Sequence, residues 1–562
     1  MAVENLITEH IDIWTSAVKT KSTSGRGSSK KLELYGIKKL RELILELAVR
    51  GKLVPQDPND EPASVLLERI KDERRAEAKN GKLKEVKAIS ENEFPYKLPI
   101  NWSFVRLEEI IQISSGKNLT AKKMDTSGKI PVYGGNGVTG IHSESNVSEK
   151  TIVIGRVGFY CGSVHLTPAC AWVTDNAFIT KYSRANLDED FLVWLLKATN
   201  LGENDSATAQ PVISGKKVYP IVVALPPKEE QRLIAAKIDE LLALCDQLEQ
   251  QTEASIEAHQ VLVTTLLDTL TNSADADELM QNWARISEHF DTLFTTEESI
   301  DQLKQTILQL AVMGKLVPQD PSDEPAAELL KRIAEEKAQL VKEKKIKKQK
   351  ALPPISEDEK PFEQPTGWEI CRLGELLPQF QNGASSRGDK EGNEIVVLRL
   401  ADIKDWQISL DDTRSIVIER KSIERYSLQE GDVLIIRVNG SADIVGRFVT
   451  CYEDYDAIYC DHFIRMRFPV ECYMPSFLSL LGSSSIIREK IADLFISTAG
   501  QKTVNQTHIS SLITVLPPIK EQLRIINKVD ELLSICNQLK VRLKESKSTQ
   551  SQLTDTIVKQ AV

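Results

Sequence analysis

The residues best suited to nucleophilic or metal chemistry in this sequence are its eight cysteines. Cys161 and Cys170, or Cys451, Cys460 and Cys472, carry thiolates that could serve as metal ligands. Their spacing is wider than that of paired zinc-binding cysteines, and the seven histidines are dispersed along the chain. We therefore expect buried thiols rather than a metal centre.

A second group of candidate residues is a loose carboxylate and lysine set of the kind found in nucleases: Asp60, Asp323, Glu85 and Lys87. Asp60 and Asp323 lie at matching places in two proline-flanked acidic stretches, where carboxylates favour the start of a helix. The sequence also lacks a GxxxxGK[ST] phosphate loop, a GxGxxG fingerprint and the N/D-P-P-Y/F/W tetrapeptide of amino-methyltransferases. We therefore expect these acids to lead helices, and we expect that the chain is not itself an enzyme.

Two tracts of the sequence occur twice. GKLVPQD stands at 51–57 and again at 314–320, and LPPKEEQRLIAAKIDELL at 225–242 is matched by LPPIKEQLRIINKVDELL at 516–533. The residues between these landmarks show no obvious repeat. A duplicated scaffold with two diverged inserts favours recognition of two different targets over a single catalytic site.

Length and charge limit the class of protein further. A chain of 562 residues is too long for one core and fits two to four domains. No apolar run is long enough to cross a bilayer, and the N-terminus lacks the features of a signal peptide, so we expect a cytoplasmic protein. The net charge of −10 argues against a protein that coats nucleic acid unaided. If the chain binds DNA, we expect a partner to supply much of the phosphate neutralisation.

Long helices are the elements that would hold the two inserts in place. After each Pro-Pro pair, apolar residues repeat at intervals of four and three: Ile234, Ile238, Leu241, Cys245 and Leu248 in the first copy, and Ile525, Val529, Leu532, Cys536, Leu539 and Leu543 in the second. This spacing predicts an amphipathic helix that packs on another helix. Each helix could lie alone on its own domain, but two copies in one chain favour antiparallel pairing of the two seams. We expect the recurring Trp102 and Trp368 to be core residues.

The fold class that these patterns predict is α+β, with two pseudo-repeated domains that hold small curled mixed sheets and are joined by paired long antiparallel helices. The expected plan is a mobile segment at 1–30, helical scaffold segments at 31–88 and 299–350, inserted recognition domains at 89–227 and 351–518, spacer helices at 228–272 and 519–562, and a linker at 273–298.

The chain resembles the specificity subunit of type I restriction-modification systems from about residue 35 to its end. The most specific match is AGQKTVNQTHISSLITVLPPIKEQLRIINKVDE at 499–531, which is similar to the family's junction between a target recognition domain and a spacer helix. IIRVNGSADIVGRF at 435–448 resembles part of the second recognition domain. The chain departs from better-known members because a scaffold segment with GKLVPQD precedes the first recognition domain. This departure looks like a circular shift of one architecture.

The resemblance implies a non-catalytic adaptor that reads double-stranded DNA. Each recognition domain would read one half of a bipartite target, and the helices would fix the spacing between the halves. Two methyltransferase subunits would bind the scaffold and bring S-adenosylmethionine, and restriction subunits with motor and nuclease activity would bring ATP and Mg²⁺. None of these cofactors is expected on this chain, and no membrane contact is expected.

Under this resemblance, Arg, Asn and Gln side chains in glycine-rich loops are the candidates for contacts with base edges, and Lys side chains for contacts with phosphates. In the first domain we select Asn136, Arg156 and Asn176, with Lys117, Lys122 and Lys123 as phosphate candidates. In the second we select Arg399, Arg437, Asn439 and Ser441, with Lys502 beside Gln501. Gln210 and Gln501 recur in both domains, so we expect them to share a backbone or geometric task. The alternative for each is a structural turn or surface residue.

Two other functions fit parts of the sequence. The chain could be a non-enzymatic coiled-coil scaffold whose two variable domains bind proteins instead of DNA. It could also be a catalytic fusion that recognises and modifies DNA alone, but the missing methyltransferase and nuclease motifs argue against this. Loss of sequence-specific DNA protection in the assembled complex would favour the first alternative.

Overall fold

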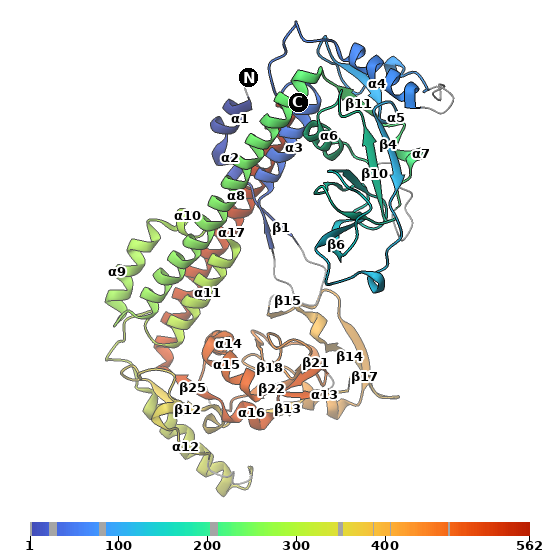
Figure 1. The fold of residues 1–562 in the computed structure, drawn as a ribbon. Helices are drawn as coiled ribbons and strands as arrows, with labels where there is room; N and C mark the ends of the chain where they lie inside the picture. The colour runs from blue at the N-terminus through green and yellow to red at the C-terminus, as the bar shows by residue number, and fades with distance from the viewer. Residues whose placement is uncertain are drawn as a thin grey trace. The chain divides into compact units, whose positions relative to one another are not determined.

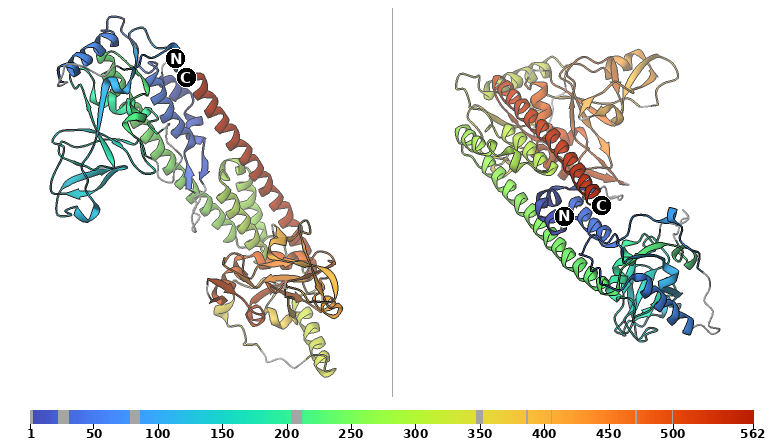
Figure 2. Two further views of the ribbon diagram at one scale, coloured as in Figure 1. Left: turned by 90° about the vertical axis from the view of Figure 1, so that its right-hand side faces the viewer. Right: turned by 90° about the horizontal axis from the view of Figure 1, so that it is seen from above.

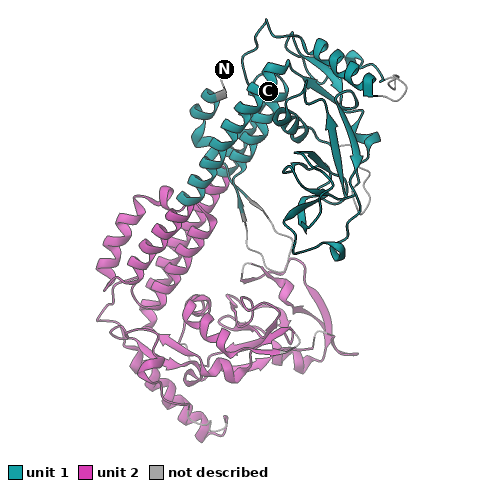
Figure 3. Ribbon diagram, in the orientation of Figure 1, with its two compact units in different colours: residues 1–255, 546–562 teal, residues 256–545 magenta. Residues whose placement is uncertain are grey.

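The fold consists of two compact units, each built around its own hydrophobic core. Figure 1 shows the computed structural model, and Figure 3 colours unit 1 (residues 1–255 and 546–562) and unit 2 (residues 256–545). None of the described helices is long and apolar enough to span a membrane. The structure describes residues 3–21, 31–77, 86–202, 212–346, 352–385, 387–404, 406–469, 472–498 and 500–562.

The start of the chain is folded where a mobile segment was expected. Helices α1 (Val3–Glu9) and α2 (Ile11–Ser16) precede a short hairpin of β1 (Lys19–Lys21) and β2 (Lys31–Glu33). Trp14 is fully buried and donates from Nε1 to the carbonyl oxygen of Leu6 at 3.3 Å. A side chain at Gly36 would collide with the Trp14 backbone, so α3 packs directly on α2. The expectation for 1–30 is therefore corrected for the described part; residues 22–30 lie outside it.

The scaffold segments are two copies of one helix pair. In unit 1 they are α3 (Tyr35–Val49) and α4 (Ala63–Glu77); in unit 2 they are α11 (Glu297–Val312) and α12 (Ala326–Lys342). GKLVPQD follows the first helix of each pair. Its glycine ends that helix, because Gly51 and Gly314 adopt left-handed φ angles of 68° and 69°.

The lysine of each GKLVPQD tract contacts the end of a long helix. Lys52 Nζ donates to the main-chain oxygen of Val562 at 2.6 Å, and Lys315 Nζ donates to that of Thr271 at 3.0 Å. Each lysine thus satisfies carbonyl groups that the end of a helix leaves without partners. The repeated tract ends one helix and caps another.

Residues 273–298, expected as a linker, contain two more helices: α9 (Ala276–Ser287) and α10 (Phe290–Leu293). They match α1 and α2, because Glu-His-x-Asp at 9–12 recurs at 288–291. His10 and His289 precede α2 and α10 with nearly identical backbone angles, φ −121°, ψ 21° and φ −119°, ψ 18°. The N-terminal segment and the linker are thus two copies of one helical element, which neither sequence pattern revealed.

The long helices α8 (Lys228–Thr271) and α17 (Ile519–Ala561) run in opposite directions, since α8 starts in unit 1 and ends in unit 2, whereas α17 does the reverse. The expected antiparallel helices are confirmed. Their two apolar seams do not pack on each other, however, because they lie in separate cores.

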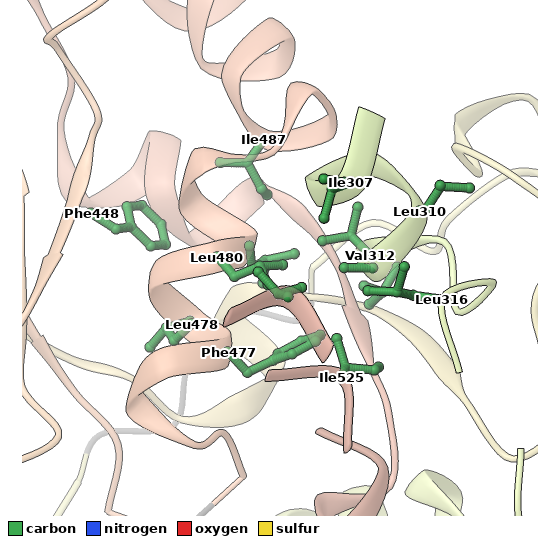
Figure 4. Close-up of a cluster of buried hydrophobic side chains, with 14 of the residues drawn as sticks. Ile307, Leu310, Val312, Leu316, Phe448, Phe477, Leu478, Leu480, Ile487 and Ile525 are labelled. Carbon is green, nitrogen blue, oxygen red and sulfur yellow. The ribbon is translucent and has the colours of Figure 1, made fainter. Parts of the chain in front are cut away.

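Each seam packs mainly on the scaffold helix of its own unit. The core of unit 1 joins Ile234 to Cys245 of α8 with Leu40, Leu43 and Leu47 of α3 and with Ile557 of α17. The core of unit 2 joins Ile525 to Leu539 of α17 with α11 and with the end of α8. Figure 2 gives two further views of these helices as ribbons. Figure 4 shows Ile525 beside Phe477, with Ile307 and Leu310 of α11 close by. Each seam is therefore packed in the core of its own unit, and this corrects the expected direct pairing of the seams.

Each recognition domain enters and leaves its scaffold through two paired strands. β3 (Ser103–Arg106) pairs with β11 (Val222–Leu225), and β12 (Glu369–Arg372) pairs with β25 (Ile513–Leu516), both antiparallel. The expected core positions of Trp102 and Trp368 are confirmed, with exposed fractions of 6% and 1%. Because entry and exit strands are neighbours, everything between them is an insertion in the scaffold.

The two recognition domains share one sheet topology. A four-stranded antiparallel sheet has the order β4-β10-β7-β8 in the first and β13-β22-β18-β20 in the second. A three-stranded mixed sheet has the order β6-β5-β9 in the first and β17-β14-β21 in the second. The expected α+β class with small mixed sheets is confirmed.

The strands of the first domain are β4 (Ile111–Ser115), β5 (Ile130–Gly134), β6 (Gly137–His142), β7 (Ile152–Gly155), β8 (Val164–Leu166), β9 (Trp172–Val173) and β10 (Ala177–Tyr182). Those of the second are β13 (Gln379–Asn382), β14 (Asn393–Leu398), β15 (Ile403–Lys404), β16 (Gln407–Ile408), β17 (Arg414–Ile418), β18 (Val433–Ile436), β19 (Val438–Asn439), β20 (Phe448–Thr450), β21 (Ala457–Tyr459), β22 (Phe463–Arg467), β23 (Ile496–Thr498) and β24 (Gln501–Thr503). The domain helices are α5 (Leu107–Ile110), α6 (Glu189–Ala198), α7 (Gly215–Val218), α13 (Arg420–Tyr426), α14 (Pro475–Ser483), α15 (Ser485–Leu494) and α16 (Gln506–Ser511).

The Glu-Gln pair after each Pro-Pro joins the long helix to its recognition domain. Gln231 is fully buried; its Oε1 accepts the Asp188 backbone N–H at 2.9 Å, and its Nε2 donates to the Pro226 carbonyl at 3.1 Å. Gln522 makes the matching contacts with Met474 N at 2.8 Å and Pro517 O at 3.1 Å. The repeated motif is thus explained by buried hydrogen bonds that fix each domain on its helix.

The acids considered for catalysis have structural roles. Asp323 is buried and forms an ion pair with Arg524 at 2.7 Å, and Asp60 lies in the turn before α4. The Lys87 carbonyl accepts a hydrogen bond from Arg106 Nε at 2.9 Å. Glu85 lies outside the described residues. These contacts fit acids that lie at the starts of helices better than they fit a carboxylate cluster of the kind found in nucleases.

Candidate nucleic-acid interface

One loop in each recognition domain joins an inner strand of the four-stranded sheet to the edge strand beside it. We name residues 156–163, between β7 and β8, tip loop 1, and residues 437–447, between β18 and β20, tip loop 2. Gly155 N donates to Ser163 O at 2.8 Å, and Ile436 N donates to Arg447 O at 3.0 Å. The loops therefore leave and rejoin the same place in the two sheets.

Two arginines that the sequence selected are equivalent residues at the start of these loops. Arg156 N donates to the Asn176 carbonyl at 2.9 Å, and its Nη1 lies 3.4 Å from the Asp175 carbonyl oxygen. Arg437 N donates to the His462 carbonyl at 2.7 Å, and its Nη1 lies 3.4 Å from the Asp461 carbonyl oxygen.

The carbonyls of the two arginines also match, since Arg156 O accepts from Ile213 N and Arg437 O accepts from Val504 N, both at 3.0 Å. Each guanidinium is half-buried and held against a strand turn. Because the same arrangement occurs in both domains, it fits a shared task such as loop orientation or phosphate contact better than selection of one particular base.

The structure brings the other base-contact candidates of the first domain together. Asn136 and Asn176 are both exposed and line one open hollow of about 220 Å³ beside tip loop 1. Lys117 lies at the same end of the sheet, because its neighbour Asn118 donates to the Asp175 carboxylate at 2.9 Å. Lys122 and Lys123 lie on the surface in a short 3-10 helix and do not line the hollow.

In the second domain, five of the selected residues cluster around tip loop 2. β19 pairs with β24, which places Asn439 opposite Lys502, and Gln501 comes directly before it. Asn439 Oδ1 accepts the backbone N–H of Ser441 at 2.9 Å, so part of its hydrogen-bonding capacity holds the turn. Arg437 starts the same loop. The cluster therefore combines turn-forming residues with exposed amide and ammonium groups.

Two candidates stand apart from these clusters. Arg399 forms an ion pair with the buried Asp402 at 2.9 Å and also donates to the Asp412 carbonyl, and the hydrogen bond with Asp402 raises its pKa. Its Nε and Nη2 donors are occupied, which favours the structural alternative for this residue. Gln210 lies outside the described residues, so its expected role stays a prediction.

The sequence analysis missed the exposed aromatic side chains near the tip loops. Phe159 and Tyr160 extend from tip loop 1, with exposed fractions of 85% and 55%, and Trp406 of the second domain is 40% exposed. The run TIVIGRVGF at 151–159 has the composition of a single strand, but β7 ends at Gly155. The available signal was the glycine on either side, since Gly158 and Gly162 have left-handed φ angles of 101° and 88° that form a turn.

The cysteines do not form a convincing metal centre in the described residues. Ligand atoms of Cys460, Asp461 and His462 lie within 4.8 Å of one another, but the three residues are consecutive in one turn. Burial raises the pKa of the Cys460 thiol to about 11, which disfavours the thiolate that a metal requires. The buried position expected for Cys451 and Cys472 is confirmed, whereas Cys161 is half-buried and Cys170 is exposed.

Comparison with known proteins agrees with this architecture. The family model of the type I restriction modification DNA specificity domain matches residues 99–258. The chain is 40% identical to the type I restriction enzyme EcoEI specificity subunit and 41% identical to the EcoAI specificity subunit, both from Escherichia coli. Each match covers 100% of both proteins.

A solved structure, the HsdS subunit from Thermoanaerobacter tengcongensis, is 18% identical and covers 84% of this chain and 98% of its own, with a TM-score of 0.39. At that score the likeness adds nothing to the assignment. The identity of about two residues in five over the full length decides it. This chain belongs to the specificity subunits of type I restriction-modification systems.

Proposed function

We propose that the two recognition domains each read one half of a bipartite target in double-stranded DNA, while the helical scaffold sets the distance between the halves. The observation that carries this proposal is the pair of equivalent sheets, which hold Arg156 and Arg437 in the same contacts but continue into different tip loops. Two equivalent sheets that carry different loops suit two domains that bind the same polymer, DNA, but prefer different base sequences.

In this proposal the candidate residues divide by chemistry. Lys117, Lys122, Lys123 and Lys502 contact phosphates, because ammonium groups bind the DNA backbone without regard to sequence. Asn136 and Asn176 offer amide groups that can pair with purine edges. Arg156 and Arg437 orient the loops and add positive charge, and Gln210 and Gln501 share a backbone or geometric task.

We further propose that the chain works without catalysis of its own, in the cytoplasm. Two methyltransferase subunits bind its pseudo-repeated scaffold and carry S-adenosylmethionine, and restriction subunits carry ATP and Mg²⁺. The duplicated helices of the two units support this assembly, because each unit offers a similar helical surface. The net charge of −10 also fits a chain that needs a partner to neutralise phosphate.

The test is a genome-wide map of methylated adenines in cells that express this chain with its cognate methyltransferase subunit, compared with cells that lack only this chain. We expect a split motif that disappears with the chain, and that motif gives both half-sites. If assembly is confirmed and no motif depends on the chain, the recognition domains bind proteins instead and the proposal is wrong.

A further inference from the structure

Exposed aromatic side chains are concentrated around the tip loops. Within the described part of the chain, five aromatic side chains are largely exposed: Phe94, Phe159, Tyr160, Trp406 and Tyr452. Phe94 stacks on Phe104 near the start of the first domain, and Tyr452 follows the far end of β20. The other three lie at the tip-loop end of the sheets. Solvent exposure of a large ring forfeits the hydrophobic stabilisation that burial would give it, so three rings at matching places need an explanation.

Tip loop 1 presents Phe159 and Tyr160 on a rigid turn. Cys161 N donates to Gly158 O at 2.9 Å, and Gly162 N donates to Gly155 O at 2.8 Å, so the turn is closed by its own main chain. The two rings meet edge to face with centroids 5.1 Å apart. They form one wall of the hollow that Asn136 and Asn176 line. The tip therefore combines an apolar projection with amide groups beside it.

The second domain brings an aromatic ring to the corresponding place by another route. In the first domain, β5 turns directly into β6 at Gly135 and Asn136. In the second, the equivalent strand β14 is followed by an inserted hairpin of β15 and β16 that carries Trp406 in its turn. The guanidinium of Arg447 lies 4.4 Å from the Trp406 ring centre. Arg447 is the last residue of tip loop 2, equivalent to Ser163, so Trp406 lies over the base of that loop.

Trp406 is also held in an unfavourable backbone conformation. Its φ angle is 64°, in the left-handed region that a bulky residue rarely adopts. Such strain costs about 1–3 kcal/mol and is found mostly where function requires it. One face of the indole is covered by Arg447, while 40% of the side chain remains exposed. A hairpin that served only to cover the arginine would not need a tryptophan at this position.

We propose that Phe159 with Tyr160 in the first domain, and Trp406 in the second, are stacking residues that enter a base step of the half-site that their domain reads. The inference rests on the proposed function. Aromatic rings stack on any base and can wedge between neighbouring bases, which kinks the duplex and adds preference for steps that unstack easily. Phe159 and Tyr160 lie within tip loop 1, and Trp406 lies over Arg447 at the base of tip loop 2, so unrelated segments bring exposed rings to the tip-loop end of both domains.

The experiment uses the assembled methyltransferase complex and a duplex with both mapped half-sites. Permanganate reactivity of thymines, with 2-aminopurine placed at successive adenine positions outside the methylated ones, reports unstacking at each step. The variants are Phe159→Ala with Tyr160→Ala, and Trp406→Ala, with Trp406→Phe as the conservative replacement. The controls are Phe94→Ala in the first domain and Tyr452→Ala in the second, which remove the two exposed rings away from the tips.

We expect the wild-type complex to unstack one step in each half-site. Each tip variant should lose the signal in its own half-site only and bind the duplex about 10- to 100-fold more weakly, as expected for loss of base stacking. Trp406→Phe should retain most of both, and the two controls should match the wild type.

Three results would overturn the inference: equal signals in wild type and tip variants, loss of both half-site signals from one tip variant, or failure of the variants to assemble with the methyltransferase subunits. The last would assign the rings to a protein interface. Failure of the proposed function is distinguishable, because the wild-type complex itself would then show no chain-dependent methylation motif.

Discussion

Unit 1 and unit 2 are built on the same framework and differ where they are most exposed. The features that recur are buried or hydrogen-bonded, as with the glutamines after Pro-Pro, Gln231 and Gln522, and the lysines that contact helix ends, Lys52 and Lys315. The features that diverge are the tip loops and the inserted β15–β16 hairpin. Repetition in this sequence therefore marks the scaffold, and under the proposed function the residues concerned with specificity lie where repetition stops.

Even the repeated buried residues are not energetically equal in the two units. In unit 1, the Glu230 carboxylate accepts from Trp102 Nε1 at 2.8 Å and from Gln56 Nε2 at 3.2 Å. In unit 2, Trp368 and Gln319 still act on Glu521 as weak hydrogen-bond partners that lower its pKa, but Glu521 Oε1 and Trp368 Nε1 lie outside normal hydrogen-bond geometry. Burial raises the pKa of both glutamates, and that of Glu521 reaches about 7. Glu521 in unit 2 is therefore less well solvated than Glu230, the equivalent residue in unit 1.

The strongest test of the comparison replaces one recognition domain and leaves the other unchanged. Replacement of residues 107–221 by the corresponding segment of another family member keeps the β3–β11 pair intact. We expect one half of the methylated motif to change completely and the other half to stay, because each domain is inserted separately in the scaffold. Methylome mapping measures both halves at once. A change in both halves would refute the assignment of one domain to each half-site.

Core truncations at matching sites should destabilise one unit at a time. Phe191 of α6 and Phe477 of α14 occupy the same place, with exposed fractions of 2% and 0%. We expect Phe477→Ala to cost about 3–5 kcal/mol in unit 2, and Phe191→Ala a similar amount in unit 1. Hydrogen exchange with peptide resolution in the assembled complex reports which unit loses protection. Equal loss in both units from either variant would contradict two separate cores.

The two buried glutamates should respond differently to pH. In the folded protein Glu521 keeps a proton that the unfolded chain releases between its usual pKa of 4.5 and about 7. Stability of unit 2 therefore falls as pH rises through this window, and Glu521→Gln should restore on the order of 1–3 kcal/mol at pH 8 but little at pH 5. Thermal unfolding at both pH values measures this.

The matched variant is Glu230→Gln in unit 1. We expect a smaller gain at pH 8, because the wild-type carboxylate already accepts from Trp102 and Gln56. If Glu521→Gln stabilises the protein equally at both pH values, the cause is not the charge of Glu521.

The smallest expected effect concerns the lysines at the helix ends. Lys315→Ala should increase hydrogen exchange in the last turn of α8, near Thr271, with a loss of about 0.5 kcal/mol. Lys52→Ala should do less at the end of α17, because Lys52 is exposed whereas Lys315 is half-buried. Hydrogen-exchange rates of peptides from the C-terminal ends of α8 and α17 show which of the two lysines contributes more. No change in either peptide would show that the lysines do not stabilise the helix ends.

The scaffold could be predicted from the sequence because its signals are local. Apolar spacing of four and three residues and the left-handed Gly51 and Gly314 define helices without reference to distant residues. The seam partners could not be predicted, because α3, which packs on α8, begins at residue 35, far from it in sequence. The short helices α1 and α2, of 7 and 6 residues, give too little periodicity to stand out.

The candidate site was predictable in part. Residue type selected Arg156, Arg437 and the asparagines, because asparagine and glycine favour turns and because guanidinium and amide groups can pair with base edges. The ion pair of Arg399 with Asp402 was visible as a three-residue spacing of opposite charges. Positions of the exposed rings depend on pairing between strands far apart in the chain, such as β14 with β21, and no local pattern reports that.

The closure of each tip loop by main-chain hydrogen bonds has an evolutionary consequence. Main-chain hydrogen bonds between Gly155 and Ser163, and between Ile436 and Arg447, close the base of each loop, and in tip loop 2 the side chains of Asn439 and Ser441 also hold the turn. A short stretch of gene, such as the codons for residues 156–163, can therefore vary in sequence or length while the surrounding sheet still folds. New DNA preferences can then arise by small local mutations as well as by recombination of whole domains, and one reader can drift while the other stays unchanged.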